Sequence, residues 1–274
     1  MADYPAIEIH LPAGDASVPD RLYAILDDYE PSAIHEEDAG EIWRVFFRSA
    51  DSRDDARAAL LQVHGIDVVA VDVPDEDWAR RSQENLKAIE AGGLIVAPPW
   101  DVPRGTATPV IIIEPSTGFG TGHHATTRLC LLMLQQLELR GARVLDIGTG
   151  SGVLALAAWK LGANDVVAVD HDPDALANAR DNIARNGAAP SIDIIRDDLD
   201  TLRIERADIV LANLTGAVLV RYAAELRSLV ADEGYLILSG FAPQDVAVIQ
   251  TAFAGLAVID TKAEADWAAM SLKS

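Results

Sequence analysis

A glycine-rich turn is the clearest chemical signal in the sequence. The segment Val144–Gly152 reads VLDIGTGSG, in which a strand-like apolar stretch runs into glycines at 148, 150 and 152. Glycine lets the backbone turn tightly and approach a bound molecule closely. Such a turn alone is weak evidence, because many strand-to-helix connections use glycine for structural reasons. Its meaning depends on the residues that follow the neighbouring strands.

Acidic residues follow the next two predicted strands. Asp170 ends the strand 165–170, where a carboxylate can accept both hydroxyls of an adenosine ribose. Asp197 follows the strand 192–195 and is the candidate partner for the amino group of adenine, although an ordinary solvated acid explains it equally well. Together with Gly148 and Gly150, these acids predict a site for an adenosine cofactor.

The cofactor expected at this turn is S-adenosylmethionine. The third glycine comes one residue earlier than in the dinucleotide pattern GxGxxG. Asp146 lies just before the turn, where a carboxylate repels a pyrophosphate but tolerates a cationic, phosphate-free cofactor. S-adenosylmethionine carries a positively charged sulfonium and matches that field. An NAD-dependent oxidoreductase and a non-catalytic adaptor with a relic cofactor fold are the competing hypotheses.

Asn213 is the candidate catalytic residue, because it ends the predicted strand 208–213 at the edge where parallel sheets bind ligands. Its amide carbonyl can accept a hydrogen bond from an attacking amine and aim the amine lone pair at the methyl carbon. The alternative is a plain helix N-cap ahead of Thr215.

The segment 114–127 (EPSTGFGTGHHATT) is too rich in Gly, Thr and His for a core element and predicts a binding loop. Thr126 or Thr127 can equally cap the helix that follows, and His123 and His124 can be ordinary exposed histidines. We expect no metal site, because no third ligand is near these histidines.

Strand and helix patterns alternate from residue 110 onward and predict a doubly wound parallel sheet that ends in an antiparallel hairpin. The predicted strands cover 110–113, 143–147, 165–170, 192–195, 208–213, 234–239, 256–260 and 267–272. The predicted helices cover 125–139, 152–161, 173–186, 216–230 and 243–253.

The first 73 residues predict a separate small module in the ferredoxin-like order β-α-β-β-α-β. Its strands are expected at 6–11, 33–36, 42–48 and 66–73, with a turn at 38–40, and its helices at 19–29 and 52–64. We expect the second helix to begin at a capping Ser52 and to end at Gly65. A connector helix over 74–91, closed by Gly92 and Gly93, follows. The expected domains are therefore 1–73, a linker at 74–93, and 94–274.

The composition is acidic, with 22 Lys and Arg against 43 Asp and Glu and a formal net charge of −21. Such a charge argues against binding to nucleic acid or to an anionic membrane surface. Residues 1–73 hold 16 acidic and 5 basic residues, which are either solvated helix faces or a docking surface for a basic partner. The single cysteine, Cys130, and the absence of a signal-peptide or membrane-span pattern predict a cytoplasmic protein. A monomer is expected.

Four segments closely resemble the bacterial ribosomal protein L11 methyltransferases (the PrmA family). They are PSTGFGTGHHATTRLCL at 115–131, LDIGTGSG at 145–152, DHDPDALANARDNIARNG at 170–187 and ANL at 212–214. The similarity extends upstream through 75–100, and the threonine-rich loop makes it specific. The sequence departs from the usual family pattern at Ser116, Gly118, His123 and Ala125.

The resemblance implies a Rossmann-like, seven-stranded class I methyltransferase domain preceded by a small ferredoxin-like α+β domain. In that family the small domain recognises ribosomal protein L11, and the larger one methylates lysine and N-terminal amino groups with S-adenosylmethionine. The cofactor contacts implied by matching positions are Thr127, Gly148, Asp170 and Asn213, and we add Gly150, Asp197 and Phe119. A lysine methyltransferase acting on the electron-transfer flavoprotein beta subunit shares much of this pattern and is the alternative.

Overall fold

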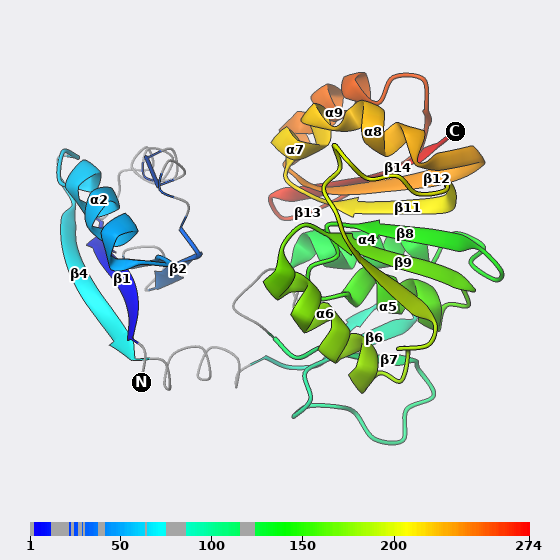
Figure 1. Cartoon of the computed structure of the whole chain (residues 1–274), viewed down its shortest axis with the longest axis horizontal. Coiled ribbons are helices and arrows are strands. Elements are labelled where there is room, and N and C mark those ends of the chain that lie inside the picture. Colours follow the sequence, from blue (N-terminus) through cyan, green and yellow to red (C-terminus); the bar gives the residue numbers. More distant parts are fainter. Residues whose placement is uncertain are drawn as a thin grey trace. The chain divides into compact units, whose positions relative to one another are not determined.

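A computed structural model (Figure 1) describes residues 3–11, 22, 25–26, 29, 31–37, 42–63, 65–74, 86–115 and 124–274. Residues 1–86 and 87–274 form two compact units. Each unit has its own sheet and its own buried apolar clusters. Among the described helices, none combines the length and the apolar character needed to cross a bilayer.

The first unit is built on a four-stranded antiparallel sheet in the order β2-β3-β1-β4. Its elements are β1 (Asp3–His10), β2 (Ala33–Glu37), β3 (Ile42–Phe46), α2 (Ala50–Leu60) and β4 (Asp67–Pro74). Strand β1 alternates, because Ile7 and Ile9 are buried whereas Glu8 pairs with Arg44 of β3 at 2.7 Å. The Arg44 guanidinium lowers the pKa of Glu8. The alternation fixes which face of the sheet carries the core.

The expected caps of the second helix in this unit are wrong. Helix α2 begins at Ala50, and its N-cap is Ser49, three residues before the predicted cap. Oγ of Ser49 accepts the N–H of Ser52 at 3.2 Å. The helix ends at Leu60 with Leu61 as C-cap, well before Gly65. Within the predicted helix 19–29, Leu22, Ile25 and Leu26 are helical. The predicted turn at 38–40 lies outside the described residues.

The expected connector helix over 74–91 is also wrong at both ends. Pro74 is the last residue of β4, and Ile89–Ala91 form strand β5, which pairs with β6 (Leu94–Ala97). Gly92 and Gly93 form the turn between these strands, with φ +63° at Gly92. Two adjacent glycines therefore marked a hairpin turn, which needs positive φ as a helix C-terminus does.

The second unit contains a seven-stranded sheet in the order β10-β9-β8-β11-β12-β14-β13. The first five strands are parallel, and β14 runs antiparallel to both of its neighbours. The strands are β8 (Arg143–Ile147), β9 (Asp165–Asp170), β10 (Ile192–Arg196), β11 (Ala207–Asn213), β12 (Val230–Phe241), β13 (Ala257–Glu264) and β14 (Trp267–Lys273). The predicted parallel sheet with a final antiparallel hairpin is confirmed.

Helices cover both faces of this sheet (Figure 1). They are α4 (Ala125–Leu134), α5 (Val153–Lys160), α6 (Pro173–Arg185), α7 (Gly216–Arg221), α8 (Ala223–Ser228), η2 (Pro243–Asp245) and α9 (Val246–Ala252). Val144 of β8 packs with residues of α4 and α5 in one cluster, whereas its neighbour Leu145 packs with residues of α7, α8 and α9 in the other. Burial on both faces explains why the central strands read as continuous apolar runs.

Three predicted elements of this unit differ from the structure. The strand β7 (Val110–Ile112) does not join the large sheet but pairs with β6 in a separate three-stranded sheet, β5-β6-β7. The predicted helix 216–230 is two short helices, because Tyr222 between them has the non-helical angles φ −105° and ψ 22°. The predicted helix 243–253 likewise begins as a short 3₁₀ turn.

Candidate functional site

The carboxyl ends of the parallel strands bring the predicted site residues to one edge of the sheet. Asp170 ends β9 and Asn213 ends β11, on either side of β8 and its glycine turn. Strand pairing sets this arrangement, since Ile147 lies opposite Val169 on one side and opposite Ala212 on the other. Open parallel sheets bind ligands at such an edge.

The glycine turn is held close to the neighbouring strands. The N–H groups of Gly148 and Thr149 both donate to the carbonyl of Val169, at 2.9 and 3.0 Å. Gly148 has φ +70°, and a Cβ there would lie 2.4 Å from Cδ2 of Leu214, the residue after Asn213. Glycine at 148 therefore allows the turn to approach the end of β11.

Asp170 is the residue that ties this turn to its surroundings. Asp170 is 8% exposed. Oδ2 accepts the N–H of Gly150 at 3.0 Å, and Oδ1 accepts the N–H of Asp172 at 3.1 Å. Each oxygen keeps a second lone pair. The carboxylate thus organises the turn and the start of α6 and retains acceptor capacity for a ligand.

Asp197 lies beside Asp170, because its backbone N–H donates to the carbonyl of Asp170 at 3.1 Å. Its side chain is used locally, since Oδ1 accepts the N–H of Asp198 at 2.8 Å and the hydroxyl of Thr201. These bonds order the loop after β10. The role predicted for Asp197 toward adenine stays a prediction.

Asn213 and Thr127, which are far apart in the sequence, meet at this edge. Nδ2 of Asn213 donates to Oγ1 of Thr127 at 3.4 Å. Thr127 lies on α4 and is 1% exposed, whereas Asn213 is half-buried. The alternative of Asn213 as a helix cap is wrong, because Thr215 is the N-cap residue of α7. The contact leaves the carbonyl oxygen of Asn213 as the acceptor for another group.

The cap of α4 is His124, so the expectation that Thr126 or Thr127 caps this helix is wrong. The imidazole Nδ1 accepts the N–H of Thr126 at 3.4 Å and lies 2.8 Å from its Oγ1. The ring packs edge-on against Trp267 with 4.8 Å between the ring centroids. Burial lowers the pKa of His124, and nearby Arg128 lowers it further. Trp267 was missed because no local pattern marks an aromatic residue in a hairpin as part of a site.

Asp146 is a buried carboxylate beneath the turn, with 1% of its surface exposed. Its Oδ2 accepts the hydroxyl of Thr149 at 2.7 Å and the N–H of Ala155 at 3.0 Å. Burial raises the pKa of Asp146 to about 6, against the lowering effect of these two hydrogen bonds. Asp146 therefore joins the strand end, the turn and the start of α5.

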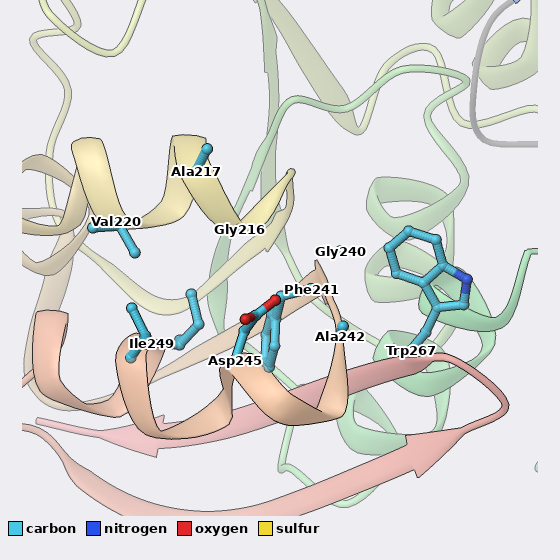
Figure 2. Close-up of a pocket in the computed structure, with 10 residues that line it drawn as sticks. Gly216, Ala217, Val220, Gly240, Phe241, Ala242, Asp245, Ile249 and Trp267 are labelled. Carbon is cyan, nitrogen blue, oxygen red and sulfur yellow. The ribbon is translucent and has the colours of Figure 1, made fainter. Parts of the chain in front are cut away.

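An apolar hollow of about 510 Å³ opens beside the end of β11 (Figure 2). Val220 of α7, Ile249 of α9 and the rings of Phe241 and Trp267 line it. Figure 2 shows the carboxylate of Asp245 within this apolar lining. An apolar wall with one acidic group is suited to an alkyl chain that ends in a cation.

Some predicted site residues cannot be placed on this edge. Phe119 and His123 lie outside the described residues. Cys130 is buried on α4, where burial raises the pKa of its thiol to about 12. Within the described ranges, no three His, Cys, Asp or Glu side chains are grouped as metal ligands.

The chain is similar in sequence to a family of known proteins. A family model described as "Ribosomal protein L11 methyltransferase (PrmA)" matches residues 26–274. The ribosomal protein L11 methyltransferase of Pelotomaculum thermopropionicum is 40% identical over 205 residues, which are 73% of this chain and 67% of that protein. The one of Geotalea uraniireducens is 36% identical over 221 residues, covering 75% and 70%.

Among solved structures, the chain is similar to a ribosomal protein L11 methylase from Lactobacillus delbrueckii subsp. bulgaricus. The TM-score is 0.64 at 28% identity, and the match covers 68% of this chain and 98% of that one.

The raised pKa of Asp146 predicts a change in the pH dependence of stability in Asp146→Asn. A pKa of about 6 in the folded chain lies above the ordinary value of 3.8, so the folded state binds this proton more tightly than the unfolded state. The penalty for the buried charge is thus absent below about pH 4 and complete above about pH 6. Asparagine does not ionise.

Urea denaturation of the ligand-free protein at several pH values measures this effect. We expect the free energy of unfolding of the variant, relative to the parent, to rise between pH 4 and pH 7. A difference that is constant across this range contradicts the burial of an ionising carboxylate at position 146.

Proposed function

This chain belongs to the ribosomal protein L11 methyltransferase family, and we propose that it transfers methyl groups from S-adenosylmethionine to amino groups of ribosomal protein L11. The observation that carries this function is one sheet edge that combines an adenosine-type site with an amide acceptor. Asp170 bonds the glycine turn at Gly150, and Asn213 bonds Thr127 on the other side of that turn. These two contacts support a methyl-transfer site in which the cofactor half and the acceptor half are adjacent.

The residues around the turn fit an adenosine with a positively charged sulfur. The two carboxylate oxygens of Asp170 can each accept a further hydrogen bond, which suits the two hydroxyls of a ribose. Asp146 and Asp170 give this edge a negative charge, which attracts a cation and repels a pyrophosphate. Bound here, S-adenosylmethionine supplies a methyl group on a cationic sulfur that a nucleophile takes directly. Gly148, Gly150 and Asp197 are the further contacts we propose, with Phe119.

Asn213 is the residue we propose for orienting the acceptor. Its Nδ2 is engaged by Thr127, so Oδ1 accepts an N–H of the incoming amine and points the nitrogen lone pair at the methyl carbon. The amine must be neutral to attack. An α-amino group, with a pKa near 8, loses its proton more readily than a lysine with a pKa near 10.4. A lysine therefore depends on desolvation beside the cationic cofactor to lower its pKa.

The apolar hollow supports a basic protein as the substrate. The alkyl stem of a lysine fits the lining of Val220, Phe241 and Trp267, and its ammonium group matches Asp245. We propose that this hollow docks a substrate lysine other than the methylated one, because Asp245 keeps an ammonium charged whereas the acceptor amine at Asn213 must be neutral.

The fold assignments of the two units follow from their strand orders. We propose that the seven-stranded sheet is a Rossmann-like class I methyltransferase domain, supported by five parallel strands with an antiparallel hairpin at one end. The order β2-β3-β1-β4, antiparallel throughout, supports a ferredoxin-like module.

We propose that this acidic module docks the basic substrate and that residues before Lys87 link the units. We also propose a cytoplasmic monomer that binds neither nucleic acid nor membranes.

Incubation of purified L11 with the protein and S-adenosylmethionine tests the proposed function directly. Intact-mass analysis is expected to show L11 species heavier by whole methyl groups, which disappear when the cofactor is omitted. If L11 keeps its mass while the electron-transfer flavoprotein beta subunit is methylated, the substrate assignment is wrong. If neither protein gains mass, the proposed methylation of L11 is also contradicted.

Asp170→Asn is expected to weaken S-adenosylhomocysteine binding about tenfold or more, because charged hydrogen bonds to the ribose become neutral ones. Titration calorimetry measures the Kd. The control is Asp174→Asn, which removes the same charge from an exposed position on α6. Equal affinity in the parent and in Asp170→Asn contradicts the ribose role of Asp170. Tight binding of NADH by the parent contradicts S-adenosylmethionine as the cofactor.

Asp245→Asn tests the proposed lysine hollow. We expect the KM for L11 to rise about threefold to tenfold, since one charge-assisted contact is lost. The KM for S-adenosylmethionine should not change, because Asp245 lines the hollow, whereas the acids that bond the glycine turn are Asp146 and Asp170. Asp266→Asn, at an exposed position next to Trp267, is the matched control. An unchanged KM for L11 in Asp245→Asn contradicts the assignment of this hollow.

A further inference from the structure

A row of asparagines on α6 holds the backbone that leads into the predicted binding loop. Asn178, Asn182 and Asn186 are spaced four residues apart and so face the same side of the helix and its C-cap. Asn186 accepts the N–H of Ile112 at 2.9 Å and donates to its carbonyl at 2.7 Å. Asn182 accepts the N–H of Glu114 at 2.8 Å, and Asn178 donates to its carbonyl at 3.4 Å.

These side-chain amides take the place of a neighbouring strand. β7 lies at the edge of its three-stranded sheet, and it pairs only with β6 there. Ile112 and Glu114 are alternate residues of an extended segment, which is the spacing at which a strand offers its N–H and C=O groups to one side. The asparagine row therefore satisfies backbone groups that an edge strand leaves open.

Asn182, unlike Asn178 and Asn186, also bonds the glycine turn. Its Nδ2 donates to the carbonyl of Ser151 at 3.0 Å, within the glycine turn, and also to Oδ1 of Asn178 at 3.3 Å. Asn182 is fully buried. One amide thus bonds both the turn and Glu114. Asp170 bonds the turn at Gly150, so side chains from β9 and α6 bond two successive residues of the turn.

Packing alone does not account for an asparagine at this position. Asparagine forms helices less well than alanine, and burying its amide costs free energy unless both ends are hydrogen-bonded. Ala179 and Ile183 on the same helix fill the core with apolar groups. The amide of Asn182 fits the two backbone groups that it bonds, one in the glycine turn and one in the segment after β7.

We infer that Asn182 is a positioning residue for methyl transfer, which sets the glycine turn and the segment ending at Pro115 in one fixed relation. This inference rests on the proposed function, because it assigns cofactor binding to that turn. A ligand that orders the turn then also stabilises the bond between Asn182 and Glu114.

Hydrogen exchange on the unmodified full-length protein tests this coupling without a mutation. The amides of Glu114 and Ile112 are both held by asparagines of the row, but only the partner of Glu114 also bonds the turn. We expect saturating S-adenosylhomocysteine to slow exchange at Glu114 at least fivefold more than at Ile112. Equal slowing at both amides, as general stabilisation gives, contradicts the inference.

Two matched variants provide a second test. Asn182→Ala is expected to raise the Kd for S-adenosylhomocysteine about tenfold, whereas Asn186→Ala keeps it within twofold although it removes bonds from the same row. Both variants lose stability, so affinity and not Tm separates a positioning role from a structural one. A Kd that shifts equally in both variants, or in neither, overturns the inference. If Asn182→Ala does not fold, the exchange experiment decides.

The outcomes also separate this inference from the proposed function. No binding of S-adenosylhomocysteine by the unmodified protein contradicts the proposed cofactor site itself. Normal binding with equal exchange at Glu114 and Ile112 contradicts only the role of Asn182.

Discussion

The structure depends on buried carboxylates that hold a glycine turn at the end of a parallel sheet. Asp146 fixes the turn from beneath through Thr149 and the start of α5. Asp170 fixes it from the side through Gly150. Both groups are kept from water, so their negative charge acts strongly over short distances. In the proposed function, the charge of the same carboxylates favours a cationic ligand over an anionic one.

The central fold and much of the site could be predicted from the sequence, because they depend on local patterns. Apolar runs that end in Gly148 or Asp170 show where buried strands stop, and parallel strands align those ends at one edge. The hairpin at Gly92 and Gly93 was misread, because adjacent glycines suit a turn and a helix end equally. Periodicity also did not separate α7 from α8, since an apolar stripe continues through the break at Tyr222.

Contacts between distant segments could not be predicted from local patterns. Thr127 meets Asn213 only because α4 packs beside β11, and His124 meets Trp267 only because the last hairpin lies against the start of α4. The sequence shows that Asn178, Asn182 and Asn186 are spaced four residues apart on a predicted helix. Their partners Ile112 and Glu114 became evident only once the edge of β7 was placed beside α6. Spacing within one helix shows which side chains share a face but not what that face meets.

The central claim is that the glycine turn is built for a positively charged, phosphate-free adenosine donor. A crystal structure of the protein grown with both S-adenosylmethionine and NADH tests this claim most directly. We predict density for the sulfonium compound alone, with its ribose hydroxyls on Asp170 and its methyl group facing Asn213. A dinucleotide lying across Gly148 and Gly150, with no sulfonium compound present, contradicts the account.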